Sequence, residues 1–270
     1  MPDRYAVFGN PVAHSKSPAI HAAFARSTGQ DIAYDAILAP VDGFRAAVDA
    51  FRNMGGRGAN VTLPFKLEAF ALATEATECA REAQAVNTLS FDGARIVGDN
   101  TDGIGLTRDI EVNLRVGIAG KLMLVMGAGG AARGVIAPLL ACAPASLTIA
   151  NRTADRAIEL SRKFARLGPV DGGSYAALAG RSFDIVVNAT SASLAGELPP
   201  LPEGVFGSDA LAYDMMYGRG LTAFLQRAKN DGVKRLADGL GMLVEQAAES
   251  FFLWRGLRPE TGPVIAMLRA

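Results

Sequence analysis

The sequence predicts two α/β domains, each organised around a mainly parallel β-sheet, with a cleft between them. The 270 residues are enough for one large domain or two of ordinary size. Short apolar segments alternate with helix-like segments almost throughout, as in a parallel sheet with crossover helices. A turn-rich segment at 98–103, GDNTDG, separates two blocks of this alternation. We therefore expect one domain formed by residues 1–103 plus 240–270, and a second formed by residues 104–239.

The first block begins with an apolar strand and continues through alternating helices and strands. Its strands are expected near residues 4–9, 32–38, 57–62 and 87–91. Its helices are expected near residues 17–28, 42–53 and 65–83, and a further helix near 103–114 follows the GDNTDG turn.

The second block begins with KLMLVM (121–126), a continuous apolar run between two glycines that is typical of a strand buried on both faces. A helix ending near Pro144 follows it. Further strands are expected at 146–150, 183–189 and 210–217, with helices near 153–166 and 220–231. The helix near 242–255 is apolar over much of its surface, so it needs burial on several sides, for instance at a domain junction.

The composition indicates a globular protein that binds neither nucleic acid nor a membrane. Half of the residues are hydrophobic and 20% are charged, with 27 Lys plus Arg against 27 Asp plus Glu. Nucleic-acid binding rests on clustered positive charge, which this balance does not favour. No apolar run approaches the roughly 20 residues of a membrane-spanning helix, and the start does not resemble a secretory signal, so we expect a cytoplasmic protein.

Metal or redox chemistry is not expected. Cys79 and Cys142 lie far apart with no CxxC motif, and His14 and His21 are the only histidines. We expect both cysteines to be small buried residues. The sequence leaves the oligomeric state open, with a homodimer as one alternative.

The segment VMGAGGAAR (125–133) fits the G-x-G-x-x-A pattern of a dinucleotide-binding loop. In this pattern the first glycine, Gly127, allows a tight turn, and the second, Gly129, lets a pyrophosphate approach the backbone. The small Ala132 lets the helix pack closely on the strand, and the helix N-terminus faces the phosphates. The pattern therefore predicts a Rossmann-like domain. The alternative is a glycine-rich turn without a ligand.

The end of the next strand favours NADP over NAD. Sites for the unphosphorylated cofactor usually carry an acidic residue about 20 positions on, where it bonds the ribose 2′-hydroxyl. Here the strand runs instead into Asn151, Arg152 and Thr153, with Arg156 one helical turn later. A guanidinium suits a 2′-phosphate, which it grips through two parallel hydrogen bonds. The alternative is that Asn151 or Thr153 caps the next helix while both arginines lie in solvent.

Lys66 is a candidate for proton transfer. In ANVTLPFK (59–66) the strand ends at Thr62 and Lys66 falls in the first turn of a helix, where its charge opposes the helix dipole. Burial in a cleft would lower its pKa, which suits a donor to a reacting oxygen. A nearby carboxylate would hold the ammonium group in place, and Asp102 is the best candidate. The alternative is a solvated lysine and an aspartate that only caps a helix.

The segment GNPVAHSKSP (9–18) predicts a turn that also binds an anion. Ser17 before Pro18 has the pattern of a helix N-cap followed by proline at the first helical position. A hydroxyl has one donor and two acceptor sites, so Ser17 can accept from a backbone N–H and still donate to a carboxylate. His14 is expected to be a turn residue rather than a catalyst.

Nine motifs occur in order along the chain: GNPVAHSKSP, ANVTLPFK, AVNTL, GDNTDG, GAGGAA, NRT, NATSAS, YDMMY and DGLGMLVEQAA. Together they resemble the shikimate dehydrogenase family over nearly the whole length. The resemblance implies an NADP-dependent oxidoreductase of aromatic amino-acid biosynthesis that reversibly reduces 3-dehydroshikimate to shikimate. It implies a substrate domain in the first block and an NADP domain in the second.

The resemblance also implies site residues. Lys66 and Asp102 would be the catalytic pair, and the substrate carboxylate would bind Ser15 and Ser17. The ring hydroxyls would bind Asn60, Thr62, Asn87, Asp102 and Gln246, with Tyr217 near the substrate. The NADP pyrophosphate would lie on Gly127, Gly129, Gly130 and Ala131, the 2′-phosphate among Asn151, Arg152, Thr153 and Arg156, and the nicotinamide beside Thr190, Ser191, Met215 and Gly239.

The sequence departs from the family pattern at two places. Ala192 and Ser193 stand where a serine-glycine pair is expected, which weakens the assignment of Ser191. Ala223 stands where family members commonly carry proline, which changes only a helix start. Neither departure involves Lys66 or Asp102.

Two other functions are the alternatives. A paralogue could act on quinate, or on both substrates, often with NAD; Arg152 argues against NAD, whereas Ser15 and Ser17 fit either carboxylate. A non-catalytic NADP-binding regulatory module would keep the glycine loop and lose Lys66 or Asp102, and both are present.

Replacing Arg152 with alanine is expected to raise the Michaelis constant for NADPH far more than that for NADH, because only NADPH carries the 2′-phosphate. Steady-state kinetics with each cofactor measures the difference. Equal changes in the two constants would contradict the role of Arg152.

Overall fold

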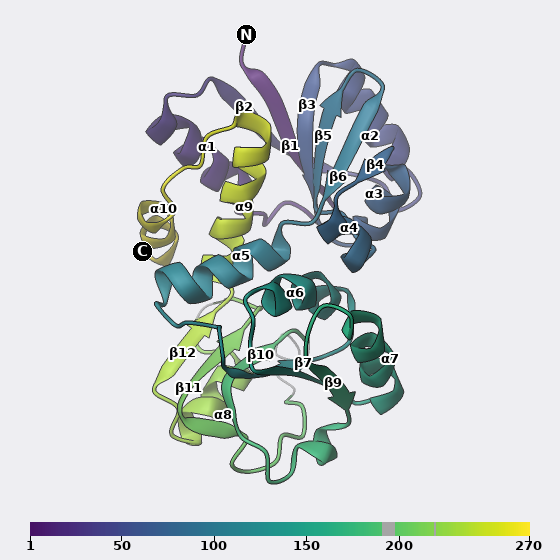
Figure 1. Ribbon diagram of the computed structural model, residues 1–270. Coiled ribbons are helices and arrows are strands. Elements are labelled where there is room, and N and C mark those ends of the chain that lie inside the picture. Colours follow the sequence, from purple (N-terminus) through teal and green to yellow (C-terminus); the bar gives the residue numbers. More distant parts are fainter. Residues whose placement is uncertain (191–197, 219) are drawn as a thin grey trace. The chain divides into compact units, whose positions relative to one another are not determined.

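The computed structural model describes residues 1–190, 198–218 and 220–270, which form two compact α/β units (Figure 1). Unit 1 comprises Met1–Gly105 with Leu243–Ala270, and unit 2 comprises Leu106–Met242. The chain passes from one unit to the other within helix α5 (Asp102–Arg108) and again within helix α9 (Leu240–Arg255).

The sheet of unit 1 has the strand order β2-β1-β3-β5-β6-β4 over the described residues. Its strands are β1 (Asp3–Gly9), β2 (Ile32–Leu38), β3 (Gly56–Val61), β4 (Glu75–Ala76), β5 (Thr88–Asp92) and β6 (Arg95–Asp99). β1 pairs in parallel with β2 and β3, whereas β5 runs antiparallel to β3 and β6. The tight β5–β6 hairpin needs a left-handed residue, which Gly93 supplies with φ of +56°.

Helices cover both faces of this sheet (Figure 1). They are α1 (Ser17–Thr28), α2 (Phe44–Asn53), α3 (Lys66–Leu72), α4 (Glu78–Ala83) and α10 (Gly262–Arg269), together with α9 and the start of α5. On one face Phe8, Phe44 and Phe65 belong to a core beneath α2 and α3. On the other, Phe24 and Phe251 belong to a core formed by α1, α9 and α10.

Three local predictions for unit 1 were wrong. The helix expected over 65–83 is interrupted by β4, because Thr74 bonds β6 through Ile96 and Thr77 caps a new helix by accepting from the Ala80 N–H. Strand β6 was not expected. Ser17 is the first helical residue of α1 rather than its N-cap, a position that Lys16 occupies, and the Ser17 N–H donates to Ser15 Oγ at 3.3 Å.

The sheet of unit 2 is parallel, with the order β12-β11-β10-β7-β8-β9 among the described residues. Its strands are β7 (Leu122–Met126), β8 (Ser146–Ala150), β9 (Val170–Gly173), β10 (Phe183–Asn188), β11 (Phe206–Asp214) and β12 (Arg235–Asp238). Counted from β7, the spatial order is 3-2-1-4-5-6, that of a Rossmann dinucleotide fold. The predicted α/β class with mainly parallel sheets is confirmed.

The apolar strand β7 is buried on both faces, as the sequence predicted. Met123 and Val125 enter a core with α6 (Gly130–Ala141) and α7 (Ala154–Phe164), whereas Leu124 and Met126 enter a core with α8 (Ala223–Asn230). A 3₁₀ turn at Tyr175–Leu178 completes the second core, and the helix that follows the GDNTDG turn ends as a π-helix at Asp109–Asn113. The short edge strands β9 and β12 were not expected from the sequence.

Neither cysteine is fully buried, contrary to the prediction. Cys79 and Cys142 are free thiols and half-buried, and burial raises the pKa of both. No group of histidine, cysteine and acidic side chains in the described part of the chain has a geometry that holds a metal ion. Among the described helices, none has the length and apolarity that crossing a bilayer requires.

His21 of α1 is fully buried in unit 1 and stacks on Tyr34, with ring centroids 4.1 Å apart. Burial lowers the pKa of His21 from 6.5 to about 3, so the imidazole is neutral in the folded protein at neutral pH. In the unfolded chain it takes up a proton below about pH 6.5. Stability from the neutral ring is therefore present above pH 6.5 and is lost as the pH falls toward 3.

Replacing His21 with phenylalanine, which keeps an aromatic ring, is expected to flatten this pH dependence. Between pH 7.5 and pH 5 the wild type should lose about 2 kcal/mol more unfolding free energy than His21→Phe. Urea titration followed by fluorescence measures it, because Trp254, the single tryptophan of the chain, lies 5.4 Å from the His21 ring. The same pH dependence in both proteins would contradict the prediction.

Candidate active site

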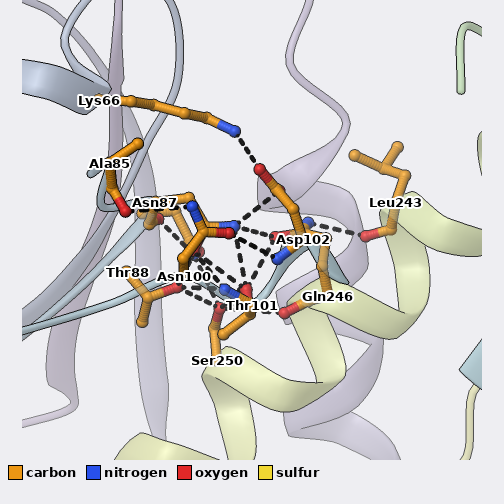
Figure 2. Close-up of polar contacts among 11 residues, drawn as sticks. Lys66, Ala85, Asn87, Thr88, Asn100, Thr101, Asp102, Leu243, Gln246 and Ser250 are labelled. Carbon is orange, nitrogen blue, oxygen red and sulfur yellow. Dashed lines mark hydrogen bonds and ion pairs between the residues drawn. The ribbon is translucent and has the colours of Figure 1, made fainter. Parts of the chain in front are cut away.

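Lys66 and Asp102 form an ion pair in unit 1, with Lys66 Nζ 2.5 Å from Asp102 Oδ2 (Figure 2). Each is the first residue of its helix, Lys66 of α3 and Asp102 of α5. A cation is unfavourable at a helix N-terminus and an anion is favourable there, so Asp102 offsets the unfavourable position of Lys66. The Lys66 side chain is 29% exposed and the Asp102 side chain 15% exposed, so the pair is mostly buried but still accessible to a ligand.

Asn87 holds the other oxygen of the same carboxylate. Its Nδ2 donates to Asp102 Oδ1 at 2.8 Å, and its Oδ1 accepts from the Thr101 N–H at 2.9 Å. The Asp102 N–H donates to Asn100 Oδ1 at 3.2 Å. Asp102 is therefore fixed through both carboxylate oxygens and its backbone.

Three buried hydroxyl groups, on Thr88, Thr101 and Ser250, lie next to the pair and are drawn below it in Figure 2. Thr88 Oγ1 and Ser250 Oγ are 2.8 Å apart, and Thr101 Oγ1 is 3.4 Å from each. Ser250 follows Gln246 by one turn of α9, so these contacts tie that helix to the sheet. They bring Gln246 Oε1 within 3.5 Å of both Asn87 Nδ2 and Thr101 Oγ1.

Sequence analysis identified Lys66, Asn87, Asp102 and Gln246, which the structure brings together, and missed the three hydroxyls. Sequence signals pointed to two of the three: Thr101 lies within the GDNTDG turn, and Ser250 is four residues after Gln246 and so lies on the same face of its helix.

Asn60 joins this cluster, but protein groups already bond both atoms of its amide. Tyr34 donates to Asn60 Oδ1 at 2.7 Å, and Asn60 Nδ2 is 2.9 Å from Ser250 Oγ and 3.1 Å from Thr88 Oγ1. Burial raises the pKa of Tyr34 well above its usual value, whereas a hydrogen bond with Ser17 acts in the opposite sense. Tyr34 thus connects the cluster with the turn after β1.

That turn carries the two predicted anion-binding serines, with Ser17 buried and Ser15 half-buried at the start of α1. Thr62 lies against the same turn, since a Cβ at Gly9 would come within 2.5 Å of Thr62 Cγ2. His14 is exposed, as expected of a turn residue.

The glycine-rich loop of unit 2 connects β7 to α6. Gly127 has φ of +103°, which favours glycine, and its N–H donates to Ala150 O at 2.7 Å. Gly129 and Gly130 are exposed, and a Cβ at either would meet no atom within 4 Å. Because the first turn of an α-helix has unpaired N–H groups, this open loop fits a phosphate group. Ala132 is fully buried where helix meets sheet, as predicted.

The residues predicted near the 2′-phosphate follow β8. Arg152, Thr153 and Arg156 are exposed, and Asn151 Nδ2 donates to Thr153 O at 2.9 Å. Thr153 occupies the N-cap position of α7, but its side chain makes no capping bond. Arg152 lowers the pKa of Tyr175, although burial is the larger effect and raises that pKa to about 12.

The residues predicted near the nicotinamide follow the other strands of the sheet. Met126, Asn188, Asp214 and Asp238 are register partners in the last row of β7, β10, β11 and β12. Thr190, Met215 and Gly239 come directly after this row, whereas Ser191 lies outside the described residues, as do Ala192 and Ser193. Tyr217 is half-buried in unit 2, and burial raises its pKa.

The strand order of unit 2 and its open glycine loop define a protein of the Rossmann dinucleotide-binding class. Three family models match the chain. They are described as the shikimate dehydrogenase substrate binding domain (residues 7–89), shikimate/quinate 5-dehydrogenase (111–195) and the shikimate 5′-dehydrogenase C-terminal domain (239–269).

Full-length relatives agree with these models. Shikimate dehydrogenase (NADP(+)) of Nitrosospira multiformis is 64% identical over 270 residues, which cover 100% of this chain and 98% of that protein. A solved structure of an Ael1 enzyme from Pseudomonas putida is 52% identical, with a TM-score of 0.95 over 98% of both chains. Shikimate 5-dehydrogenase of Thermus thermophilus, solved with NADP(H) and shikimate, is 33% identical, with a TM-score of 0.87 over 99% of this chain and 98% of that one. The chain belongs to the shikimate dehydrogenase family.

Proposed function

We propose that this protein is an NADP-dependent oxidoreductase that reversibly reduces 3-dehydroshikimate to shikimate. The observation that carries the proposal is the Lys66–Asp102 ion pair, held within a buried cluster of amides and hydroxyls in unit 1. The full-length likeness to proteins named shikimate dehydrogenase (NADP(+)) supports the same activity. We assign substrate binding to residues 1–103 plus 240–270 and NADP binding to residues 104–239.

The substrate is assigned to the polar groups of unit 1. The carboxylate binds Ser15 and Ser17 at the N-terminus of α1, where the helix dipole favours an anion. Ring hydroxyls bind the side chains around the ion pair, with Tyr217 of unit 2 near the substrate. The hydroxyl-binding residues are Asn60, Thr62, Asn87, Asp102 and Gln246.

NADP is assigned to the carboxyl edge of the unit 2 sheet. The pyrophosphate binds at the open loop of Gly127, Gly129, Gly130 and Ala131, and the 2′-phosphate binds among Asn151, Arg152, Thr153 and Arg156. Arg152 and Arg156 are both exposed at the start of α7, so both guanidinium groups are available to an anion. The nicotinamide lies beside Thr190, Ser191, Met215 and Gly239.

Proton transfer is the task of the ion pair. When bound, NADPH supplies the hydride that the ketone carbon accepts. Lys66 Nζ–H stabilises the growing charge on the carbonyl oxygen and donates the proton that makes it a hydroxyl. Asp102 holds the ammonium group by its Oδ2, and Asn87 holds Asp102 by its Oδ1. In the reverse direction Lys66 takes the proton back from the hydroxyl.

We place the reaction in the cytoplasm, as one step of aromatic amino-acid biosynthesis. The oligomeric state stays open, with a homodimer as one alternative.

Initial rates with shikimate or quinate, each with NADP or NAD, test the function. Shikimate with NADP is expected to be the best pair, because Arg152 and Arg156 suit the 2′-phosphate. The absorbance of the reduced cofactor measures each rate. A clear preference for quinate would identify a paralogue of different specificity instead, and tight NADP binding without turnover of either substrate would identify a non-catalytic module.

A further inference from the structure

Asp214 is a fully buried carboxylate at the end of β11 that no catalytic step above uses. It stands opposite Asn188, which is fully buried at the end of β10, in the last row of the unit 2 sheet. A buried charge is costly unless hydrogen bonds satisfy it. The partners that satisfy Asp214 therefore show what the carboxylate holds in place.

Asp214 bonds three different segments of unit 2. Its Oδ1 accepts from Asn188 Nδ2 at 3.2 Å and from the Met216 N–H at 3.0 Å. Its Oδ2 accepts from Thr222 Oγ1 at 2.6 Å. The Thr222 hydroxyl also caps α8 by accepting from the Leu225 N–H. One carboxylate thus joins the end of β10, the turn after β11 and the start of α8.

Asn188 extends this network toward the glycine-rich loop. Asn188 Oδ1 accepts from both the N–H and the Oγ1 of Thr190, at 3.1 and 2.7 Å. Thr190 in turn lies against Gly127, where a Cβ would be 3.0 Å from Thr190 Cγ2.

The turn after β11 extends the network in the other direction. Gly239 packs so closely on Met215 that a Cβ there would be 2.1 Å from the Met215 carbonyl oxygen, and its N–H donates to Met216 O at 3.1 Å. The described residues assigned to the nicotinamide, which are Thr190, Met215 and Gly239, are therefore all linked to Asp214 or to its partner Asn188.

We propose that Asp214 is a positioning residue that sets the nicotinamide side of the NADP site by holding the turns after β10 and β11 together. The proposal rests on the proposed function, which assigns these turns to the nicotinamide. The adenosine side follows β8, which pairs with β7 and β9 and not with β10 or β11. Loss of the carboxylate should therefore affect one end of the cofactor and leave the other unchanged.

Asp214→Ala tests the proposal, with Asp214→Asn as the matched control. The dissociation constant for NADPH, measured by its fluorescence, is expected to rise about tenfold in the alanine variant, as for loss of a charged hydrogen bond of about 1.4 kcal/mol. The constant for 2′,5′-ADP, which carries only the adenosine end, should stay unchanged. In the asparagine variant both constants should stay close to wild type, because its amide oxygen accepts from Asn188 and Met216 and its Nδ2 donates to Thr222 Oγ1.

An unchanged NADPH constant in folded Asp214→Ala would overturn the proposal, and so would a parallel weakening of 2′,5′-ADP. If Asp214→Ala does not fold, Thr222→Val and Thr222→Ser replace it. The valine variant should weaken NADPH but not 2′,5′-ADP, the serine variant should weaken neither, and any other pattern overturns the proposal. Absence of shikimate oxidation in the wild type would contradict the proposed function, while the two binding constants still decide the role of Asp214.

Discussion

The chemistry of unit 1 depends on Lys66, whose positive charge lies at the N-terminus of a helix, where the helix dipole disfavours a cation. Lys66 begins α3, and the charge that compensates it, Asp102, begins α5 at the far end of the GDNTDG turn. Two opposite charges at two helix N-termini need a fixed separation, and Asn87 supplies it by bonding Asp102 Oδ1 and the Thr101 N–H. Most of the polar side chains around them serve this geometry.

The sheets of the two units position their functional groups in different ways. In unit 2 a single row of register partners ends β7, β10, β11 and β12, so the residues that follow line one edge, as is usual for ligand sites in open parallel sheets. Unit 1 instead draws its cluster from an antiparallel strand, β5, and from α9, which is more than a hundred residues away in the sequence. In unit 1, buried hydrogen bonds rather than strand register therefore hold the functional side chains in place.

The sequence predicted the features whose signal is local and strong. Strand β7 was recognisable because all of its own residues are apolar. Gly127 and Ala132 each occupy a position with one steric requirement, a left-handed φ at Gly127 and full burial between helix and sheet at Ala132. The Lys66–Asp102 contact was only a candidate, because spacing carries no information on whether two turns meet. Thr88 could not be predicted, since a buried hydroxyl and a solvated one have the same sequence pattern. Strand β4 was missed because it has only two residues, and its parallel pairing with β6 starts from the bond between the Thr74 N–H and Ile96 O rather than from an apolar repeat.

Whether Lys66 and Asp102 act as one catalytic unit is decided most directly by a double-mutant cycle on shikimate oxidation with NADP. Lys66→Met and Asp102→Asn should each lower kcat by about 100-fold or more, as expected for loss of acid–base catalysis. The double variant should be no slower than the slower single variant, because residues that act as a unit are strongly non-additive. Losses that multiply in the double variant, or near wild-type turnover in either single one, would contradict the pair as the centre of the site.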